Sequence, residues 1–269
     1  MHKSRGLSAS ALKYYALIAM TIDHFAWYFV STYSWLGQVM HIIGRTVIPI
    51  MCALLVEGFY KTRNIKKYVL RMAVFALISR IPYFMFQFAR LPFFVIAGRI
   101  VIDKNLFVAQ SVIYTLTLSL LMLVVLHSKI KKPVKVILVI LLFALTYVGD
   151  WGIYAPLLVL VFDKFRGDFK RQAISVCFLG LVLWPVLLIT LYGMAVTNLS
   201  DSLSRIFFQM TTPLALIPLY FYNEKRENVK FKFINKWIFY IYYPVHLLVL
   251  VELRFGIGAI VNNFLVQLK

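Results

Sequence analysis

The feature that most limits what this chain can fold into is a succession of long apolar runs along its 269 residues. An α-helix crosses the hydrocarbon core of a bilayer with about 20 mostly apolar residues. Nine runs reach or approach that length: residues 12–33, 39–59, 68–88, 106–127, 134–148, 153–165, 174–192, 203–222 and 237–252. The tail, residues 255–268, is a candidate tenth element. The sequence therefore predicts a single-domain, all-α integral membrane protein, a polytopic bundle of about nine to ten transmembrane helices.

Composition supports a bilayer as the solvent for this chain. Hydrophobic residues make up 62% of it and charged residues only 14%, against about 45–50% and about 25% in ordinary soluble domains. Both cysteines, Cys52 and Cys177, lie inside apolar runs, which favours a role as small packing residues. We expect no metal site.

Lysine and arginine gather in alternate breaks between the apolar runs. They precede the first run and follow the second, fourth, sixth and eighth, whereas residues 34–38, 149–152 and 193–201 hold none. Only the break at 90–104, with three, departs from this alternation. Since basic loops stay cytoplasmic, we expect a multi-pass protein of the cell membrane with its N-terminus in the cytoplasm and its ninth helix ending outside. The net charge of +19 thus reflects topology, and we expect no nucleic-acid partner.

Ionisable residues inside the apolar runs are the informative exceptions. Each costs roughly 2.5–3.5 kcal/mol to insert, so it faces a partner or a water-filled cavity. They are Asp23, His24, His41, Arg45, Glu57, Arg80, Asp150 and His246. In the expected topology six of them fall in the outer half of the membrane or at its outer edge: Asp23, His24, Arg45, Arg80, Asp150 and His246. This common depth predicts one site.

Structural alternatives exist for the residues of the first two runs. Asp23 and Arg45 alternatively form an ion pair between helices, and His24 is alternatively a satisfied histidine of the bundle. His41 shares a helix face with Arg45, four residues later, but lies close to the water boundary, which favours a structural role. Glu57 is expected to pair with Lys61.

The residues of the later runs have structural alternatives as well. In the structural alternative, the Arg80 side chain extends to the water boundary or donates to backbone carbonyls that Pro82 leaves without a hydrogen bond. In the structural alternative for His246, its imidazole donates to the Tyr240 carbonyl, because Pro244 has no N–H to donate to it. Asp150 lies at the water boundary, where a structural role is favoured. From these residues alone, an enzyme and a proton-coupled transporter remain equally open, because histidines and buried carboxylates serve general-base catalysis and proton relays alike.

Four segments resemble the TraX family, which is named for the enzyme that acetylates the N-terminus of conjugative pilin. They are LKYYALIAMTIDHF at 12–25, IGRTVIPIMCALLVEGFYKTRNIKKYVLRMAVFALISRIPY at 43–83, DWGIYAPLLVLVF at 150–162 and KWIFYIYYPVHLLVL at 236–250. Their order and spacing fit over essentially the whole chain, and GR-x-x-x-P, EGF-x-x-TRN and YYPVHLL are specific in combination. The chain departs from the family pattern at Arg80, where glutamine or another polar residue often stands.

The resemblance implies a membrane-embedded acyltransferase, since the first helix is similar to helices of transmembrane acyltransferases that carry a histidine near their outer end. Acetyl would pass from cytoplasmic acetyl-CoA, the expected co-substrate, to an acceptor on the outer side: a peptide N-terminus, a glycan or an envelope polymer. A proton-coupled small-molecule transporter is the alternative, and an assembly factor with purely structural polar residues is a third possibility. A homo-oligomer is also compatible with the sequence.

The residues expected to carry the reaction follow from the resemblance. His24 acts as general base or takes the acetyl group covalently, Asp23 sets its charge or pairs with Arg45, and Arg45 or Arg80 stabilises the oxyanion. His246 is expected in the same cavity.

The basic break after the second run is expected to hold the phosphates of acetyl-CoA, because arginine and lysine both bind phosphate. Its residues are Lys61, Arg63, Lys66, Lys67 and Arg71. The alternative is that these residues only mark the cytoplasmic side.

Overall fold

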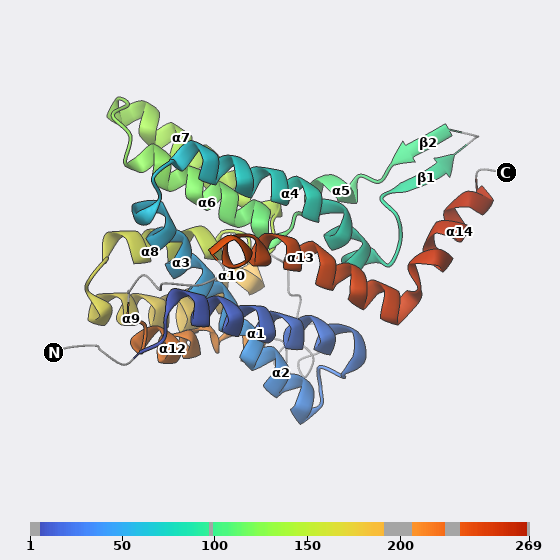
Figure 1. Cartoon of the computed structure of the whole chain (residues 1–269), viewed down its shortest axis with the longest axis horizontal. Coiled ribbons are helices and arrows are strands. Elements are labelled where there is room, and N and C mark those ends of the chain that lie inside the picture. The colour runs from blue at the N-terminus through green and yellow to red at the C-terminus, as the bar shows by residue number, and fades with distance from the viewer. Residues whose placement is uncertain (1–5, 97–98, 191–205, 224–231, 268–269) are drawn as a thin grey trace. The chain divides into compact units, whose positions relative to one another are not determined.

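The computed structural model describes residues 6–96, 99–190, 206–223 and 232–267, and these are almost entirely helical (Figure 1). The chain divides into two compact units, each built from two separate stretches of sequence. Unit 1 comprises Met1–Tyr60 and Leu157–Lys236, and unit 2 comprises Lys61–Pro156 and Trp237–Lys269. The expected outer loop at 193–201 and the basic residues Lys3, Arg5, Lys225, Arg226 and Lys230 lie outside the described residues.

The described part of unit 1 is helical. Its elements are α1 (Ala9–Phe29), α2 (Trp35–Arg45), α3 (Val47–Lys61), α9 (Phe169–Phe178), the π-helical turn η2 (Leu179–Leu183), α10 (Trp184–Thr190), η3 (Thr212–Ala215) and α12 (Leu216–Tyr220). Boundaries between the units fall within α8 (Tyr154–Lys164), at the end of α3 and near the start of α13 (Lys232–Phe255).

Helix α1 begins where Ser8 caps it: the Ser8 hydroxyl oxygen accepts a hydrogen bond from the Ala11 amide at 3.1 Å. A buried stripe of small and apolar residues, including Ala16 and Ala19, continues to Asp23 and Ala26 at helical spacing. A short turn then reverses the chain, so that α2 packs antiparallel beside α1. The stripe therefore presents Asp23 to α2.

The second predicted run is one long helical stretch, Trp35–Lys61, that breaks at Thr46. Proline has no N–H to donate to the carbonyl four residues earlier, so Pro49 cannot bond the Arg45 carbonyl, which fits a break at this point. The Thr46 hydroxyl donates to the Ile43 carbonyl at 2.7 Å, and it also lies 2.9 Å from the Tyr15 hydroxyl of α1. The break is thus tied to α1.

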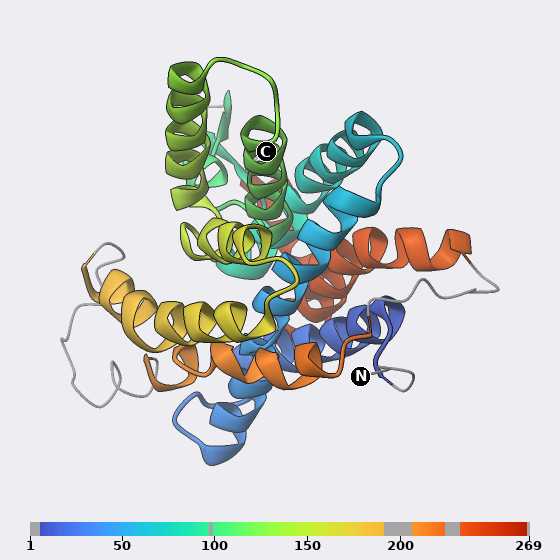
Figure 2. The same ribbon diagram turned by 90° about the vertical axis from the view of Figure 1, so that its left-hand side faces the viewer.

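Unit 2 consists of further helices and one β-hairpin. Its elements are α4 (Ile65–Phe88), β1 (Phe93–Ile96), β2 (Arg99–Ile102), α5 (Asn105–Val108), α6 (Val112–Leu126), α7 (Lys132–Leu145), η1 (Thr146–Val148), α13 (Lys232–Phe255) and α14 (Ile257–Gln267). Figure 2 shows α4, α6 and α7 side by side.

The hairpin is the exception to the expectation of an all-α chain. Strands β1 and β2 are antiparallel, with Phe93 opposite Ile102 and Ile96 opposite Arg99. The strands are rich in β-branched and aromatic residues, and two residues, one of them a glycine, join them, which is a pattern typical of a hairpin.

Every predicted apolar run corresponds to helix in the described residues. Four helices are long and apolar enough to cross a membrane: Trp35–Lys61, Ile65–Phe88, Phe169–Thr190 and Trp237–Phe255. Val112–Leu126 and Ile206–Tyr220 are shorter apolar helices. The chain is therefore a helical membrane protein, and the expected number of nine to ten crossings is not confirmed by helix length and composition.

Candidate functional site

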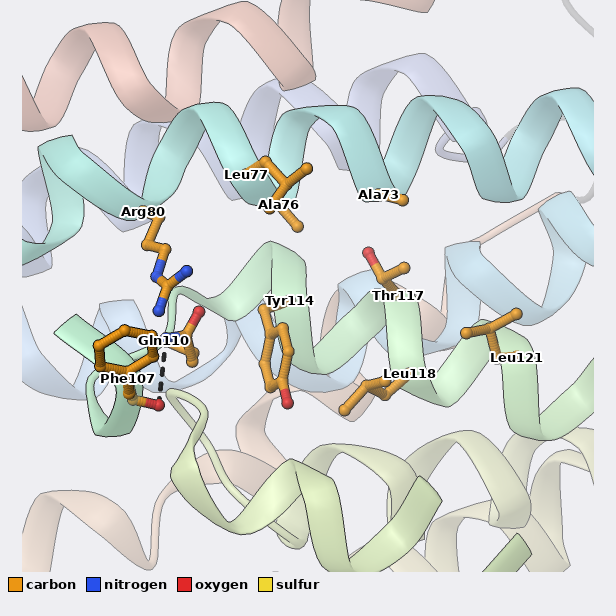
Figure 3. A pocket seen from close by; sticks show the side chains of 10 residues that line it. All are labelled: Ala73, Ala76, Leu77, Arg80, Phe107, Gln110, Tyr114, Thr117, Leu118 and Leu121. Carbon is orange, nitrogen blue, oxygen red and sulfur yellow. Dashed lines mark hydrogen bonds between the residues drawn. The ribbon is translucent and has the colours of Figure 1, made fainter. Parts of the chain in front are cut away.

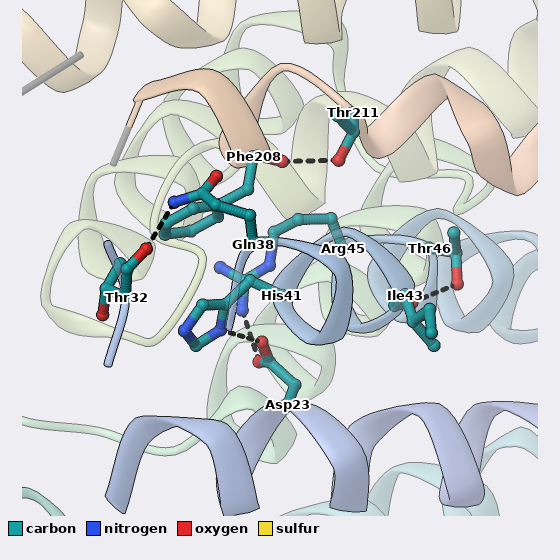
Figure 4. A network of polar contacts seen from close by, with 9 residues as sticks. All are labelled: Asp23, Thr32, Gln38, His41, Ile43, Arg45, Thr46, Phe208 and Thr211. Carbon is teal, nitrogen blue, oxygen red and sulfur yellow. Dashed lines mark hydrogen bonds and ion pairs between the residues drawn. The ribbon is translucent and has the colours of Figure 1, made fainter. Parts of the chain in front are cut away.

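Asp23 is the centre of a buried polar cluster between α1 and α2 in unit 1 (Figure 4). Its Oδ1 lies 2.8 Å from Nδ1 of His41, and its Oδ2 accepts a hydrogen bond from Nη2 of Arg45 in an ion pair. Asp23, His41 and Arg45 are only 5%, 0% and 6% exposed. The expected ion pair between Asp23 and Arg45 is thus present, and His41 joins it.

Gly44 allows this cluster to form. A Cβ atom at Gly44 would overlap the Cβ and Cγ atoms of Asp23, so only glycine lets α2 approach α1 this closely here. Because Gly44 immediately precedes Arg45, the close approach also sets the position from which Arg45 reaches the carboxylate. In the GR pair, Gly44 therefore permits the close packing of α2 on α1, and Arg45 pairs with the Asp23 carboxylate.

Aromatic rings enclose the imidazole of His41. The ring centroid of Trp27 lies 4.5 Å from that of His41, and Phe208, which belongs to Ile206–Tyr220, stacks on it at 4.8 Å. The Arg45 guanidinium carbon lies 5.3 Å from the Phe208 ring centroid. In the described part of the chain, Nε2 of His41 is buried without a hydrogen-bond partner.

The contacts of His41 determine which nitrogen carries its proton. A carboxylate paired with arginine only accepts hydrogen bonds, so Nδ1 of a neutral His41 is the donor to Asp23. Nε2 then holds the lone pair. This is the arrangement in which a carboxylate orients a histidine as a general base.

His24 lies next to Asp23 on α1 and is half-buried, and it interacts electrostatically with Asp23. Neighbouring residues of a helix point in different directions, so His24 does not share the direction of Asp23 toward α2. The structure therefore brings together Asp23, His41 and Arg45, with His24 at the edge of the group.

Arg80 and His246, the other predicted catalytic residues, belong to unit 2. Nε and Nη2 of Arg80 both donate to the Leu106 carbonyl, at 2.9 and 2.8 Å, so the suggestion that Arg80 bonds carbonyls freed by Pro82 was wrong. A long side chain at this position reaches α5 instead. The prediction that His246 shares a cavity with Asp23 stays a prediction.

His246 is buried in α13, where its Nδ1 donates to the Tyr242 carbonyl at 2.9 Å. The suggested bond to the Tyr240 carbonyl was wrong, because a helical side chain reaches the carbonyl four residues back more readily than one six residues back. The His246 ring also stacks on Tyr242, with centroids 5.2 Å apart.

Glu57, expected to pair with Lys61, accepts a hydrogen bond from the Tyr222 hydroxyl within unit 1. The Asp150 backbone carbonyl accepts a hydrogen bond from the Thr115 hydroxyl at 2.8 Å. Each of these contacts connects separate segments within its own unit.

The predicted phosphate-binding residues surround the N-terminus of α4. The Asn64 side chain caps this helix by accepting from the Lys67 amide at 3.0 Å. Arg63, Lys66 and Lys67 are exposed, and Lys61 is half-buried at the end of α3. Arg71, one turn into α4, lies with its guanidinium carbon 5.6 Å from the Tyr68 ring centroid. A helix N-terminus attracts anions, so the basic side chains and the N-terminus of α4 both favour a bound anion here.

Among the residues that the structure describes, no group of three or more His, Cys, Asp or Glu side chains is arranged to hold a metal ion. Two members of the cluster are not among the predicted catalytic residues: His41, for which the sequence favours a structural role, and Phe208. The four-residue spacing of His41 and Arg45 was the signal available for His41, whereas nothing in the sequence connects Phe208 to it.

Comparisons with known proteins agree with the motifs. The family model of the TraX protein matches residues 8–254. The protein named "Probable fimbrial assembly protein FimC, serogroup H1", from Dichelobacter nodosus, is 32% identical over 262 residues, covering 93% of this chain and 97% of that protein. No solved structure matches the chain. The match of the family model over most of the chain shows that this protein belongs to the TraX family.

Proposed function

We propose that this protein is a membrane acyltransferase that transfers acetyl from cytoplasmic acetyl-CoA to an acceptor on the outer side of the cell membrane. We further propose that it crosses the membrane nine to ten times, with its N-terminus in the cytoplasm. Membership of the TraX family supports the class of reaction. The observation that carries the proposal is the His41 imidazole, held by Asp23 at Nδ1 with Nε2 unbonded among the described residues.

In the proposed reaction, Nε2 of His41 takes the proton from the attacking amine or hydroxyl of the acceptor. The acceptor forms a bond to the thioester carbonyl carbon, and the bond from that carbon to sulfur breaks. The coenzyme A thiolate leaves and receives the proton back from the imidazolium. Asp23 holds the imidazole in the required tautomer and stabilises its charged form. Arg45 supplies positive charge for the developing oxyanion.

This assignment gives His41 the role that the resemblance implied for His24. Apart from His24, the sequence offers no other histidine within the α1–α2 pair. His24 therefore remains the second candidate for the base, and Arg80 and His246 remain candidate site residues in unit 2. Variants of each histidine distinguish the two candidates.

We propose that Lys61, Arg63, Lys66, Lys67 and Arg71 hold the phosphates of acetyl-CoA. Three of these cations are exposed around a helix N-terminus, where amides and side chains both attract phosphate. The expected cytoplasmic position of this break is the side on which acetyl-CoA is found.

The acceptor that fits best is the N-terminus of a surface-fibre subunit. The Dichelobacter nodosus relative is named a probable fimbrial assembly protein, which supports an extracytoplasmic peptide over a glycan or envelope polymer.

The test uses cells that lack the protein and cells in which it is restored. Surface-fibre subunits are isolated from both and their N-terminal peptides are weighed by mass spectrometry. We expect one acetyl group only where the protein is present. A parallel assay follows radiolabelled acetyl from acetyl-CoA into membrane fractions. The proposal is overturned if restoring the protein adds no acetyl group to any fraction, and uptake of a solute into vesicles driven by a pH gradient would then favour a transporter.

A further inference from the structure

A groove runs along unit 2 between α4 and α6 (Figure 3). It has a volume of about 440 Å³. Its apolar part is lined by Ala73, Ala76 and Leu77 of α4 and by Leu118 and Leu121 of α6, and Arg80 lies at one end beside Phe107. From Ala73 to Arg80 the groove follows α4 for about 10 Å, since a helix rises 1.5 Å per residue.

Arg80 brings a positive charge to the end of this groove, and no described carboxylate forms an ion pair with it. A guanidinium has five N–H donors. Two of them bond the Leu106 carbonyl, and in the described part of the chain no carboxylate or other acceptor is bonded to the remaining three. The Phe107 ring lies beside the guanidinium, with its centroid 5.0 Å from the Arg80 carbon. The free donors form a fork of the kind that binds a phosphate oxygen pair.

The backbone beside Arg80 indicates the depth of this end of the groove. Before α6 begins at Val112, the chain forms the four-residue helix α5 and an irregular connection. Lys104, in the turn that leads into α5, is exposed, whereas the connection at 109–111 is not. Exposed irregular backbone does not occur within the hydrocarbon region of a bilayer. Arg80 is therefore level with the phospholipid head groups, and the apolar part of the groove lies at the level of the acyl chains.

We propose that the groove holds one acyl chain of an anionic phospholipid, whose phosphate lies against the Arg80 guanidinium. A neutral apolar helix from a partner protein would cover Leu77 and Leu121 but would leave the arginine without an anion. A phospholipid supplies the chain and the anion in one molecule, and basic pockets between transmembrane helices bind anionic head groups in this way. The inference rests on the groove and on Arg80 alone and does not depend on the proposed function.

The experiment measures lipid retention, so it needs no acetyl acceptor. The full-length protein is delipidated in a mild detergent and titrated with phosphatidylglycerol or with phosphatidylcholine of the same chains. Native mass spectrometry counts the lipids bound to each molecule. We expect one phosphatidylglycerol to bind about tenfold more tightly than phosphatidylcholine, the difference of one charge-assisted hydrogen bond.

The charged end and the apolar part of the site are tested by separate variants, each with a matched control. Arg80→Gln keeps a donor for the Leu106 carbonyl but removes the charge, so the preference for phosphatidylglycerol should disappear. Arg99→Gln on β2 is the matched control, because it removes an exposed cation of unit 2 away from the groove and should keep the preference.

Ala73→Phe fills the groove and should remove the bound lipid of either kind. Val74→Phe, at the next position of α4 and not part of the groove lining, should retain it. Circular dichroism and gel filtration confirm that the variants fold. The inference is overturned if the wild-type protein binds both lipids equally, if Ala73→Phe and Val74→Phe behave alike, or if acyl-CoA competes for the site while phosphatidylglycerol does not bind.

Discussion

The buried charge pair at the α1–α2 contact allows stability and catalysis to be separated. Asn at position 23 keeps the size of the side chain but removes the carboxylate that Arg45 and His41 share. Asp23 and Arg45 are 5% and 6% exposed, so the remaining arginine charge stays largely away from water. Removing one partner of a buried ion pair costs about 3–5 kcal/mol. We expect Asp23→Asn to lose about that much free energy of unfolding, a large share of a typical 5–15 kcal/mol.

Removing both charges should restore stability without restoring activity. Removing both charges leaves no unpaired charge away from water, so Asp23→Asn combined with Arg45→Met should recover most of the loss. The double-mutant cycle should show a coupling of about 2 kcal/mol or more between the two positions. Acetyl transfer should stay absent in the double variant, because no carboxylate holds His41 in the required tautomer or stabilises its charged form. Unfolding is followed in mixed micelles during a titration with SDS. Additive effects of the two changes, or an unaltered Asp23→Asn protein, would refute the reasoning.

Three further predictions concern packing, co-substrate binding and topology. Gly44→Ala should lower the free energy of unfolding by about 1–3 kcal/mol in the same titration, because the added methyl meets the Asp23 carboxyl. The control Gly258→Ala, where an added Cβ meets nothing within 4 Å, should not lower it. Lys66→Gln should raise the KM for acetyl-CoA about threefold and leave kcat unchanged, as expected for one lost phosphate contact, and an unchanged KM would contradict the phosphate site. Cysteines placed in the turn between α1 and α2 should be labelled from outside the cell, and those in residues 129–135 only from inside; the opposite result would reverse the topology.

The apolar runs made the helices predictable, since run length alone sets where a helix can lie in a bilayer. The hairpin at β1 and β2 was missed because it lies in a break between two apolar runs, and run length gives no signal for strands. The break at Thr46 was missed as well, although Pro49 was visible in the sequence.

The site was only partly predictable, because tertiary contacts decide which polar residues meet. Helical spacing placed His41 and Arg45 on one face, but the partner of that face depends on how α2 packs on α1. Gly44 fixes that packing through contact with Asp23, which only the structure shows. In the same way, the Arg80 partner comes from α5, 26 residues later in the chain, where no sequence pattern connects the two.

The most direct test of the account compares acetyl transfer by His41→Gln and His24→Gln at matched membrane abundance. Vesicles from cells lacking the wild-type protein receive each variant, and the transfer of radiolabelled acetyl from acetyl-CoA to the surface-fibre fraction is measured. Glutamine keeps a hydrogen-bonding group but cannot cycle a proton, so His41→Gln should lower the rate by about 10²-fold or more, while His24→Gln retains a larger share of it. Near-normal transfer by His41→Gln together with an inactive His24→Gln would contradict the account and assign the base to His24.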